Sequence, residues 1–211
     1  MRKIRSVLFV FIIVFGLSLA VVQPLDNFPQ VQAATQPVTL TTTVLAYLTL
    51  DITAGGTVAF GNLTPGTPIC YATGTVASVV TNAANGYTLG LSDATAAPNS
   101  SMAQGGVYIP KMTNGTIATP VVWGSNYGVG ANLYAADTGK DTTQWGAGTT
   151  VCDALNKYAA VPQAATTAHT VTGFHSSANT SSWSFKIDVP NTQQTGAYSG
   201  TVTYTATAVL S

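Results

Sequence analysis

Hydrophobic and polar residues alternate with a period of two along the C-terminal segment from Tyr198 to Leu210. Even-numbered positions carry mostly apolar side chains, and threonine occupies most of the odd-numbered ones. A period of two rich in β-branched residues predicts a half-buried antiparallel strand rather than a helix. No sortase-type motif or apolar tail follows, so we expect any surface attachment to involve the N-terminus or partner proteins. The residues predicted to face the core are Tyr198, Val202, Tyr204, Ala206, Ala208 and Leu210.

A similar alternation runs from Val38 to Ile52, where apolar residues hold the even positions apart from Thr42. A run of this length exceeds the usual strand. It is therefore predicted either to bend and change sheets or to divide into a free leading segment and a true first strand. Gly55 and Gly56 then end the run.

Further strands are predicted at 75–81, 87–91 and 183–189, where apolar and β-branched residues recur. Asn85 and Gly86 lie between the first two of these segments and favour positive φ angles, which predicts a hairpin turn joining them. From Ser92 to about Thr170 the alternation weakens into a region of predicted loops. Only short strands are expected there, at 107–109, 121–123 and 133–134.

These elements predict an all-β chain without internal repeats. We expect a single domain from 34 to 211, an Ig-like or pilin-like antiparallel β-sandwich with a long loop-rich middle. A chain of this length can bury a core of its own. The composition agrees, because after Ala33 the chain lacks glutamate and arginine, which are common on surface helices.

The N-terminus has the pattern of a secretory signal peptide, predicted to span residues 1–33. Arg2, Lys3 and Arg5 precede an apolar run from Val7 to Val22. Val31 and Ala33 fit a cleavage site after Ala33, which predicts a secreted, extracellular or cell-surface protein. The alternative is an uncleaved anchor, although the apolar run is short for crossing a bilayer.

Charge limits the classes of partner. Beyond Ala33, six aspartates against four lysines give a net charge of −2. So weak a field does not hold a nucleic-acid backbone or an acidic membrane by counterion release. We therefore expect no nucleic-acid partner and, after signal cleavage, no membrane partner.

Cys70 and Cys152 are the two cysteines of the chain. An even number in an exported protein predicts that they pair, and on the chain-entropy model a loop of this size would stabilise the fold by about 4 kcal/mol. A free reactive pair is the alternative. Two thiols without clustered histidines do not form a zinc site.

The sequence shows no set of residues for catalysis. His169 and His175 are the two histidines, and both are expected in solvated loops. The nucleophile-elbow and zinc-protease motifs are absent, and with no glutamate after Ala33 paired carboxylates would have to come from scattered aspartates. We therefore expect no catalytic residues, no cofactor and no enzymatic activity.

Two local patterns suggest binding sites. The segment Asp137 to Asp141 faintly resembles a calcium loop, but it lacks the closing glutamate and contains Lys140, so a turn between strands and no metal site is expected. Four aromatic residues form a candidate carbohydrate-binding surface, with burial in the core as the alternative. They are Trp123, Tyr127, Tyr134 and Trp145.

Several segments, taken in order, resemble the spore coat protein U family of secreted pilin-like domains, which includes subunits of chaperone–usher pili. The C-terminal match is also similar to WxL-type and Ig-like surface domains of Gram-positive bacteria. The chain differs from the family near Leu48, where the family has a first-strand cysteine. The matching segments are Val44 to Ala46, Phe60 to Gly61, Leu133 to Asp137, Trp145 to Gly148 and Gly196 to Thr203.

The resemblance and the edge-strand chemistry together predict a structural subunit of a bacterial surface fibre, pilus or coat. Such a subunit would join copies of itself or other surface proteins by strand addition. The candidate donor strand is 34–43, with Val38 and Leu40 as inserted residues, and its alternative role is as part of its own first strand. A monomeric adhesin or glycan-binding module that uses Gly105 to Gly148 is the second interpretation, and a secreted hydrolase is the third.

Overall fold

The computed structural model describes residues 36, 38–94 and 99–210. The predicted signal peptide, residues 1–33, lies outside the described residues. The chain divides into two units, Met1–Thr43 and Val44–Ser211, and the second contains all the strands described below. In the first unit the described residues, 36 and 38–43, adopt no helix or strand.

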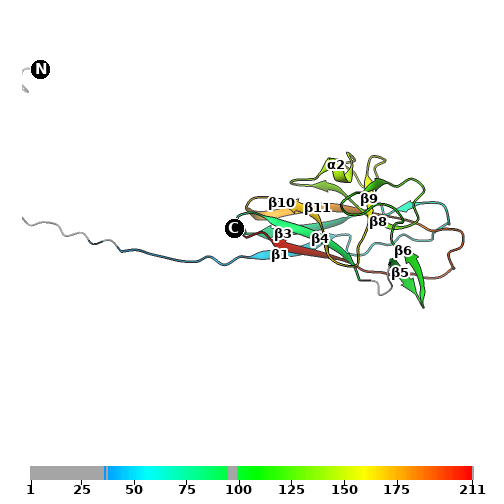
Figure 1. Cartoon of the computed structure of the whole chain (residues 1–211), viewed down its shortest axis with the longest axis horizontal. Helices are drawn as coiled ribbons and strands as arrows, with labels where there is room; N and C mark the ends of the chain where they lie inside the picture. Colours follow the sequence, from blue (N-terminus) through cyan, green and yellow to red (C-terminus); the bar gives the residue numbers. More distant parts are fainter. Residues whose placement is uncertain (1–35, 37, 95–98, 211) are drawn as a thin grey trace, which may run out of the picture. The chain divides into compact units, whose positions relative to one another are not determined.

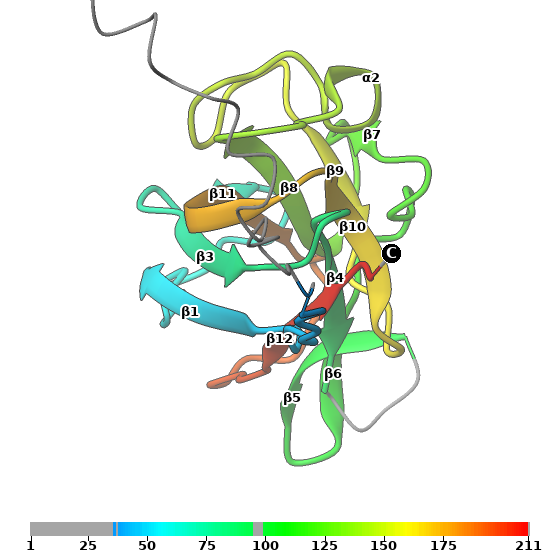
Figure 2. The same cartoon turned by 90° about the vertical axis from the view of Figure 1, so that its left-hand side faces the viewer.

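Two antiparallel sheets form the second unit, and Figure 2 shows them face to face, with β1 and β12 as neighbours at one side. The first sheet has the order β1 (Leu48–Ala54), β3 (Thr75–Thr81), β11 (His175–Asp188), β8 (Gly128–Ala136), β9 (Lys157–Ala160) and β7 (Val121–Val122), and β2 (Ile69–Cys70) also pairs with β11. The second sheet has the order β10 (Thr166–Val171), β4 (Tyr87–Asp93) and β12 (Val202–Ala208). The predicted fold class, an all-β antiparallel sandwich, is confirmed.

Smaller elements extend this sandwich (Figure 1). A hairpin of β5 (Ser100–Gln104) and β6 (Val107–Pro110) forms a separate two-stranded sheet. A single helical turn, α2 (Thr142–Trp145), follows β8. Asp141 caps this turn by accepting hydrogen bonds from the backbone N–H groups of Thr143 and Gln144, at 2.8 and 3.0 Å.

The main core lies between the two sheets. Strand β3 contributes Ala77 and Val79, and β4 contributes Leu89 and Leu91, all fully buried. Trp183 of β11 packs edge-on against Trp145 and Tyr204, with ring centroids 5.5 and 5.9 Å away. Such edge-to-face pairs add to the stabilisation from apolar burial.

The two alternating segments behave differently. In β12, Val202, Tyr204 and Ala206 pack against the core while the intervening threonines are exposed, so the predicted strand is confirmed over Val202–Ala208. The prediction is wrong for Leu210, which lies beyond the strand and is exposed. The fifteen-residue run, by contrast, becomes a strand only at Leu48. The prediction of a leading segment followed by a true first strand therefore matches the structure better than one bent strand.

The predicted hairpin between 75–81 and 87–91 is wrong. Gly86 does adopt a positive φ of 84°, but the turn carries the chain from the first sheet to the second, because β3 pairs with β1 and β11 whereas β4 pairs with β10 and β12. Both strands bury their apolar residues in the main core, so they face each other across it rather than pairing edge to edge.

The loop-rich middle holds more structure than its sequence suggests. Strand β8 has nine residues where a short strand was expected, and its first six are all buried. Burial of both faces removes the alternation on which the prediction depends. The strand is also rich in glycine and alanine, which have low β-propensity.

Candidate functional site

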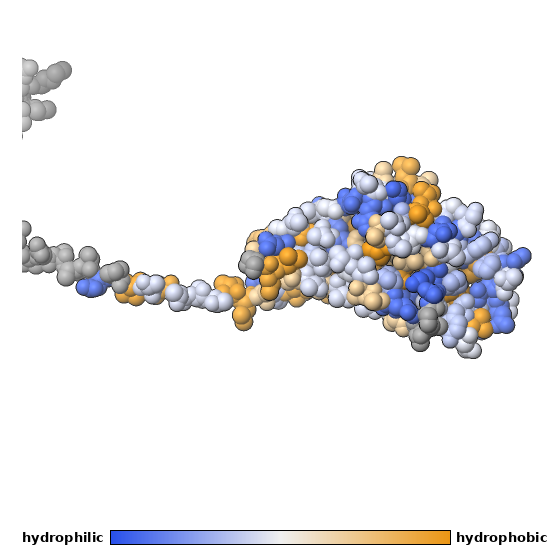
Figure 3. Space-filling view, viewed as in Figure 1, coloured by the Kyte–Doolittle hydropathy of each residue, from blue (hydrophilic) through white to orange (hydrophobic). Residues whose placement is uncertain are grey.

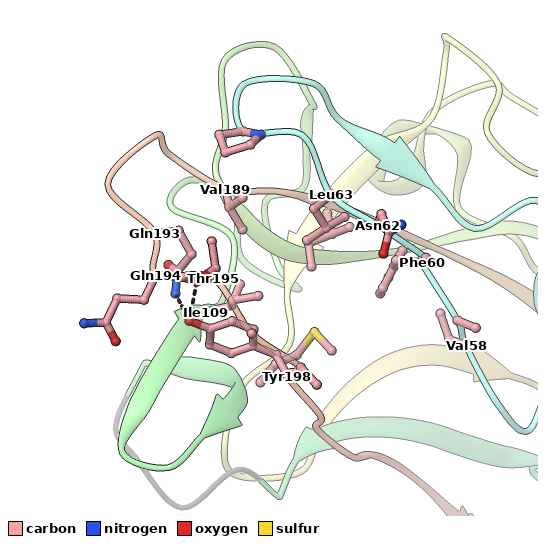
Figure 4. Close-up of a pocket in the computed structure, with 17 residues that line it drawn as sticks. Val58, Phe60, Asn62, Leu63, Ile109, Val189, Gln193, Gln194, Thr195 and Tyr198 are labelled. Atoms are coloured by element: carbon pink, nitrogen blue, oxygen red, sulfur yellow. Dashed lines mark hydrogen bonds between the residues drawn. The ribbon is translucent and has the colours of Figure 1, made fainter.

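An apolar groove of about 640 Å³ lies between segment 58–65 and segment 193–198 (Figure 4). Ile109, Ile187 and Val189 line it, and they belong to a small buried cluster separate from the main core. Partly buried side chains packed on that cluster also line the groove, namely Phe60, Leu63, Met102 and Tyr198. The groove therefore exposes hydrophobic surface that a stable fold usually covers.

The rim of this groove is polar but uncharged. Asn62 lies on one wall, and Gln193, Gln194 and Thr195 lie on the other (Figure 4). None of the seventeen lining residues drawn in Figure 4 is Asp, Glu, Lys, Arg or His. An uncharged apolar groove favours an uncharged apolar ligand, because a buried charge without a partner is costly.

A second hollow, of about 440 Å³, continues the groove toward the ends of β1 and β12. The two hollows share Val58, Phe60, Met102 and Tyr198 among their lining residues. Within the described sheets, β1 pairs only with β3 and β12 pairs only with β4, so both are edge strands. The combined groove thus follows the side on which the sandwich has two open edges.

The backbone of segment 58–63 is available for pairing. Within the described chain, no hydrogen bond is formed by the backbone of these six residues. Backbone hydrogen bonds resume at Thr64, whose carbonyl accepts from the Thr67 N–H at 3.0 Å, and the Gly66 N–H donates to the carbonyl of Val189 at 3.0 Å. Backbone N–H and C=O groups are strong hydrogen-bonding groups, and a row of free ones is a template for another strand. The positive φ of 70° at Gly61 divides this row into two short stretches.

The opposite wall is held in place by its own hydrogen bonds. The Gln193 side-chain amide donates to the carbonyl of Tyr108 and to the hydroxyl of Tyr198, at 3.2 and 2.8 Å. Ala103 of β5 and Ser199 exchange two backbone bonds of 2.8 and 3.1 Å. The wall is thus braced by the β5–β6 hairpin, and the groove is preformed.

The predicted donor residues lie in the first unit. Val38 and Leu40 are 82% and 90% exposed and belong to no strand.

The prediction that four aromatic residues form a binding surface is wrong for the two tryptophans. Trp123 is buried edge-on against Tyr158, with ring centroids 5.5 Å apart, and Trp145 is buried against Trp183. The indole N–H of Trp145 also donates to the carbonyl of Ala168 at 3.1 Å. Tyr127 is exposed and Tyr134 is partly buried, so the four do not share one exposed face. The apolar area of the tryptophan rings drives them into the core.

The predicted disulfide is confirmed. Cys70 and Cys152 are bonded, with their Cα atoms 5.8 Å apart, and the bond ties β2 to the segment that follows α2. The Tyr158 hydroxyl lies 3.7 Å from the Cys70 sulfur. The disulfide therefore anchors the loop region to the first sheet.

The histidines have no catalytic surroundings. His169 was expected in a solvated loop, but it is buried in β10, where burial lowers the pKa of its imidazole and outweighs a backbone hydrogen bond with Thr138. Its Nε2 atom is buried without a hydrogen-bond partner. His175 begins β11, and its Nε2 lies 3.2 Å from the carbonyl oxygen of Thr172. Among the residues that the structure describes, neither ring has a hydrogen bond to a carboxylate, a hydroxyl or a thiol.

The segment Asp137 to Asp141 is a connection without regular structure, but it joins β8 to α2 rather than two strands. Asp137 accepts hydrogen bonds from the N–H and hydroxyl of Thr180, at 2.7 and 2.8 Å, and Asp141 caps α2. The Lys140 ammonium donates to the carbonyls of Tyr134 and Gly148. Among the described residues, no three of His, Cys, Asp and Glu are grouped so as to hold a metal ion.

No model of a known protein family matches the chain, and no curated protein matches it. In the described part of the chain, no helix is long and apolar enough to cross a membrane.

Sequence reasoning missed the groove as a site. The sequence pattern places Phe60 at the end of a brief resumption of the first strand, and Leu63 lies in a segment dominated by turn residues. The available signal in the sequence is that Phe60 and Leu63 are apolar residues in a stretch rich in glycine and proline. Such residues usually form a small hydrophobic cluster under a loop.

Proposed function

We propose that this protein is a non-enzymatic extracellular structural subunit, a component of a bacterial surface fibre, pilus or coat that joins other copies by strand addition. The observation that carries the proposal is the preformed apolar groove beside the unpaired backbone of 58–63. A strand laid in the groove would cover its hydrophobic floor and use those backbone groups at the same time.

Segment 34–43 has the properties that such a groove requires. It contains no charged residue, and Val38 and Leu40 are two positions apart, so in an extended chain they lie on the same face. Each would contribute about 1.5 to 3 kcal/mol if fully buried in a neighbour. Thr39, Thr41 and Thr43 would remain on the solvent side, whereas Thr42 shares the face of Val38 and Leu40.

Export is part of the proposal. A disulfide persists in oxidising compartments such as the outside of the cell, which supports secretion. Removal of the predicted signal peptide after Ala33 would place the donor segment at the start of the mature chain. The resemblance to pilin-like domains supports the same function.

One observation favours a second candidate, an adhesin that binds a glycan or an extended peptide. The amides of Asn62 and Gln193 stand at the rim of a groove that also contains the Phe60 and Tyr198 rings. Amide groups beside aromatic rings suit both ligands. Trp123 and Trp145 do not contribute to such a site, because both side chains are buried.

The test uses the full-length chain, expressed in a secreting host and purified after export. Val38→Asp together with Leu40→Asp should abolish association, because two charges would enter an apolar groove. Thr39→Asp together with Thr41→Asp is the matched control, since it adds the same charge to the opposite face. Light scattering with size-exclusion chromatography and electron microscopy would measure assembly.

A wild-type protein that stays monomeric at high concentration would contradict strand addition. So would a deletion of 34–43 that prevents folding, because the segment would then belong to its own domain. In either case, binding of the monomer to a glycan array or to extended peptides would favour the adhesin.

A further inference from the structure

Exposed hydrophobic side chains gather at the end of the second unit where β1 begins and β12 ends (Figure 3). We call this group the terminal patch. Each of its members is more than half exposed and none is charged. It consists of Val44, Leu45, Tyr47, Phe174 and Leu210.

The terminal patch is built around the turn between β3 and β4. The Asn82 side chain accepts a hydrogen bond from the Tyr47 N–H at 2.6 Å and donates one to the Leu45 carbonyl at 2.9 Å. The Asn85 side chain donates to the Leu210 carbonyl at 3.2 Å. Two asparagines thus fix two of the three chain segments of the patch to one turn, and the third segment, with Phe174, connects β10 to β11.

Because of these hydrogen bonds, the chain between the anchored Leu45 and the donor segment is very short. With Leu45 fixed by Asn82, only Val44 separates it from Thr43, the last residue of the donor segment. The Cα atoms of Thr43 and Leu45 can be at most about 7 Å apart. A donor segment seated in a neighbour would therefore bring that neighbour's groove to the base of the terminal patch.

We propose that the terminal patch docks against the groove end of the next copy of this chain and forms the second half of the same joint. The inference rests on the proposed strand addition and adds a contact between folded domains. Two observations favour a second copy as the occupant. First, the short connection between the donor segment and the domain holds the neighbouring copy close to the terminal patch. Second, the two surfaces are compatible, because the patch is apolar and the groove lining is uncharged.

The two surfaces lie at opposite ends of the same strands. The terminal patch flanks Leu48 and Ala208, whereas the groove of about 640 Å³ lies beyond Ala54 and before Val202. The adjoining hollow reaches back along the strands as far as Ile52 and Tyr204. Seven residues of strand separate the ends by about 23 Å. One subunit can therefore hold a neighbour at each end, which gives a head-to-tail interface that repeats along a fibre.

The experiment again uses the exported full-length chain. The photoreactive residue p-benzoylphenylalanine is placed at Phe174 or, as the control, at Leu155, which have nearly equal exposure of 60% and 61%. After irradiation, intersubunit adducts are mapped by mass spectrometry. Adducts from Phe174 should fall on peptides covering 58–65 or 193–199, and Leu155 should yield no adduct to those peptides.

Charge substitutions provide the second measurement. Phe174→Asp with Leu210→Asp should raise the dissociation constant of the assembly about 100-fold. Val122→Asp with Leu155→Asp should change it less than threefold, although those residues are equally exposed, at 58% and 61%. Intact disulfides and unchanged circular dichroism would establish that each variant is folded.

The outcomes separate the two proposals. In the first outcome, Val38→Asp with Leu40→Asp abolishes assembly, but Phe174→Asp with Leu210→Asp binds as tightly as its control and position 174 gives no adducts in the groove. Domain docking would then be wrong, and strand addition would stand. If the wild type does not associate, both are wrong. A third outcome is that assembly survives Val38→Asp with Leu40→Asp but is weakened by Phe174→Asp with Leu210→Asp. The subunits would then associate without strand addition, and the inference would again be wrong.

Discussion

The outer face of the first sheet and the groove side of the sandwich are both apolar, but only the first is covered by the chain itself. On the outer face, Met112, Trp123 and Tyr158 form a buried cluster, and the Lys186 ammonium lies 5.5 and 5.7 Å from the two ring centroids. On the groove side, Phe60 and Leu63 border an open hollow. Segments of the chain therefore cover the apolar outer face of the first sheet, whereas the apolar floor of the groove remains exposed.

The difference lies in how the covering segments are fastened. Over the outer face, the Asn132 side chain donates to the carbonyls of Trp145 and Lys157, at 2.9 and 2.7 Å, and the disulfide holds the segment after α2. Beside the groove, segment 58–63 has no backbone hydrogen bond within the described chain. The closed region serves stability, whereas the open region is where the proposed donor strand would bind.

The largest expected effect tests the closed region through its disulfide. Replacing both cysteines, Cys70→Ser and Cys152→Ser, should lower the free energy of unfolding by about 4 kcal/mol, since the unfolded chain regains the entropy of a large loop. Denaturant titration would measure the loss. Thiol labelling of the unreduced, unfolded wild type at both positions would contradict the pairing on which this prediction depends.

A pair of truncations compares the two regions directly. Trp123→Ala should cost about 3 kcal/mol, because it leaves a cavity in the covered cluster. Leu63→Ala should cost about 1 kcal/mol, because its side chain is only partly buried beside the groove. Chemical denaturation of both variants measures the loss in the free energy of unfolding. Equal losses would contradict the distinction between a closed and an open region.

The sequence predicted elements with one buried face and missed those with two. In β12 the alternation of Tyr204 and Ala206 with threonine indicated the strand and its core face. In β8, Ala131 faces the main core while Asn132 is buried on the other side, so no alternation survives. Local pattern also could not decide whether Gly86 turns within a sheet or between sheets, because pairing depends on distant strands.

The site was less predictable than the fold. Sequence predicted the cysteine pair, which the structure confirms, and the donor role of Val38 and Leu40 stays a prediction based on their period. It did not identify the groove, because Phe60, Ile109 and Val189 come from three separate parts of the chain. The position of Trp123 was equally undetermined, since an aromatic residue in a loop region suits a surface or a small core.

The smallest expected effect uses pH to distinguish the two regions. His169 lies in β10 beside a hollow of about 200 Å³ that Trp145 and Gln144 also line. Burial lowers the pKa of His169 below its ordinary value of 6.5, so the folded protein favours the neutral ring. Below about pH 6.5 the unfolded chain binds a proton that the folded chain resists, and stability therefore falls as the pH drops toward the lowered folded pKa.

His169→Gln should flatten this pH dependence, because glutamine does not titrate, and His175→Gln is the control because that ring is partly exposed. Thermal unfolding measured between pH 8 and pH 5 would test it. Assembly through the groove should change little over the same range, since its lining holds no carboxyl, imidazole or amine side chain. Acid-induced unfolding that is the same in wild type and His169→Gln would show that another group controls the stability of the closed region. Acid-induced disassembly of a still-folded protein would instead show that an ionisable group outside the groove lining lies in the joint.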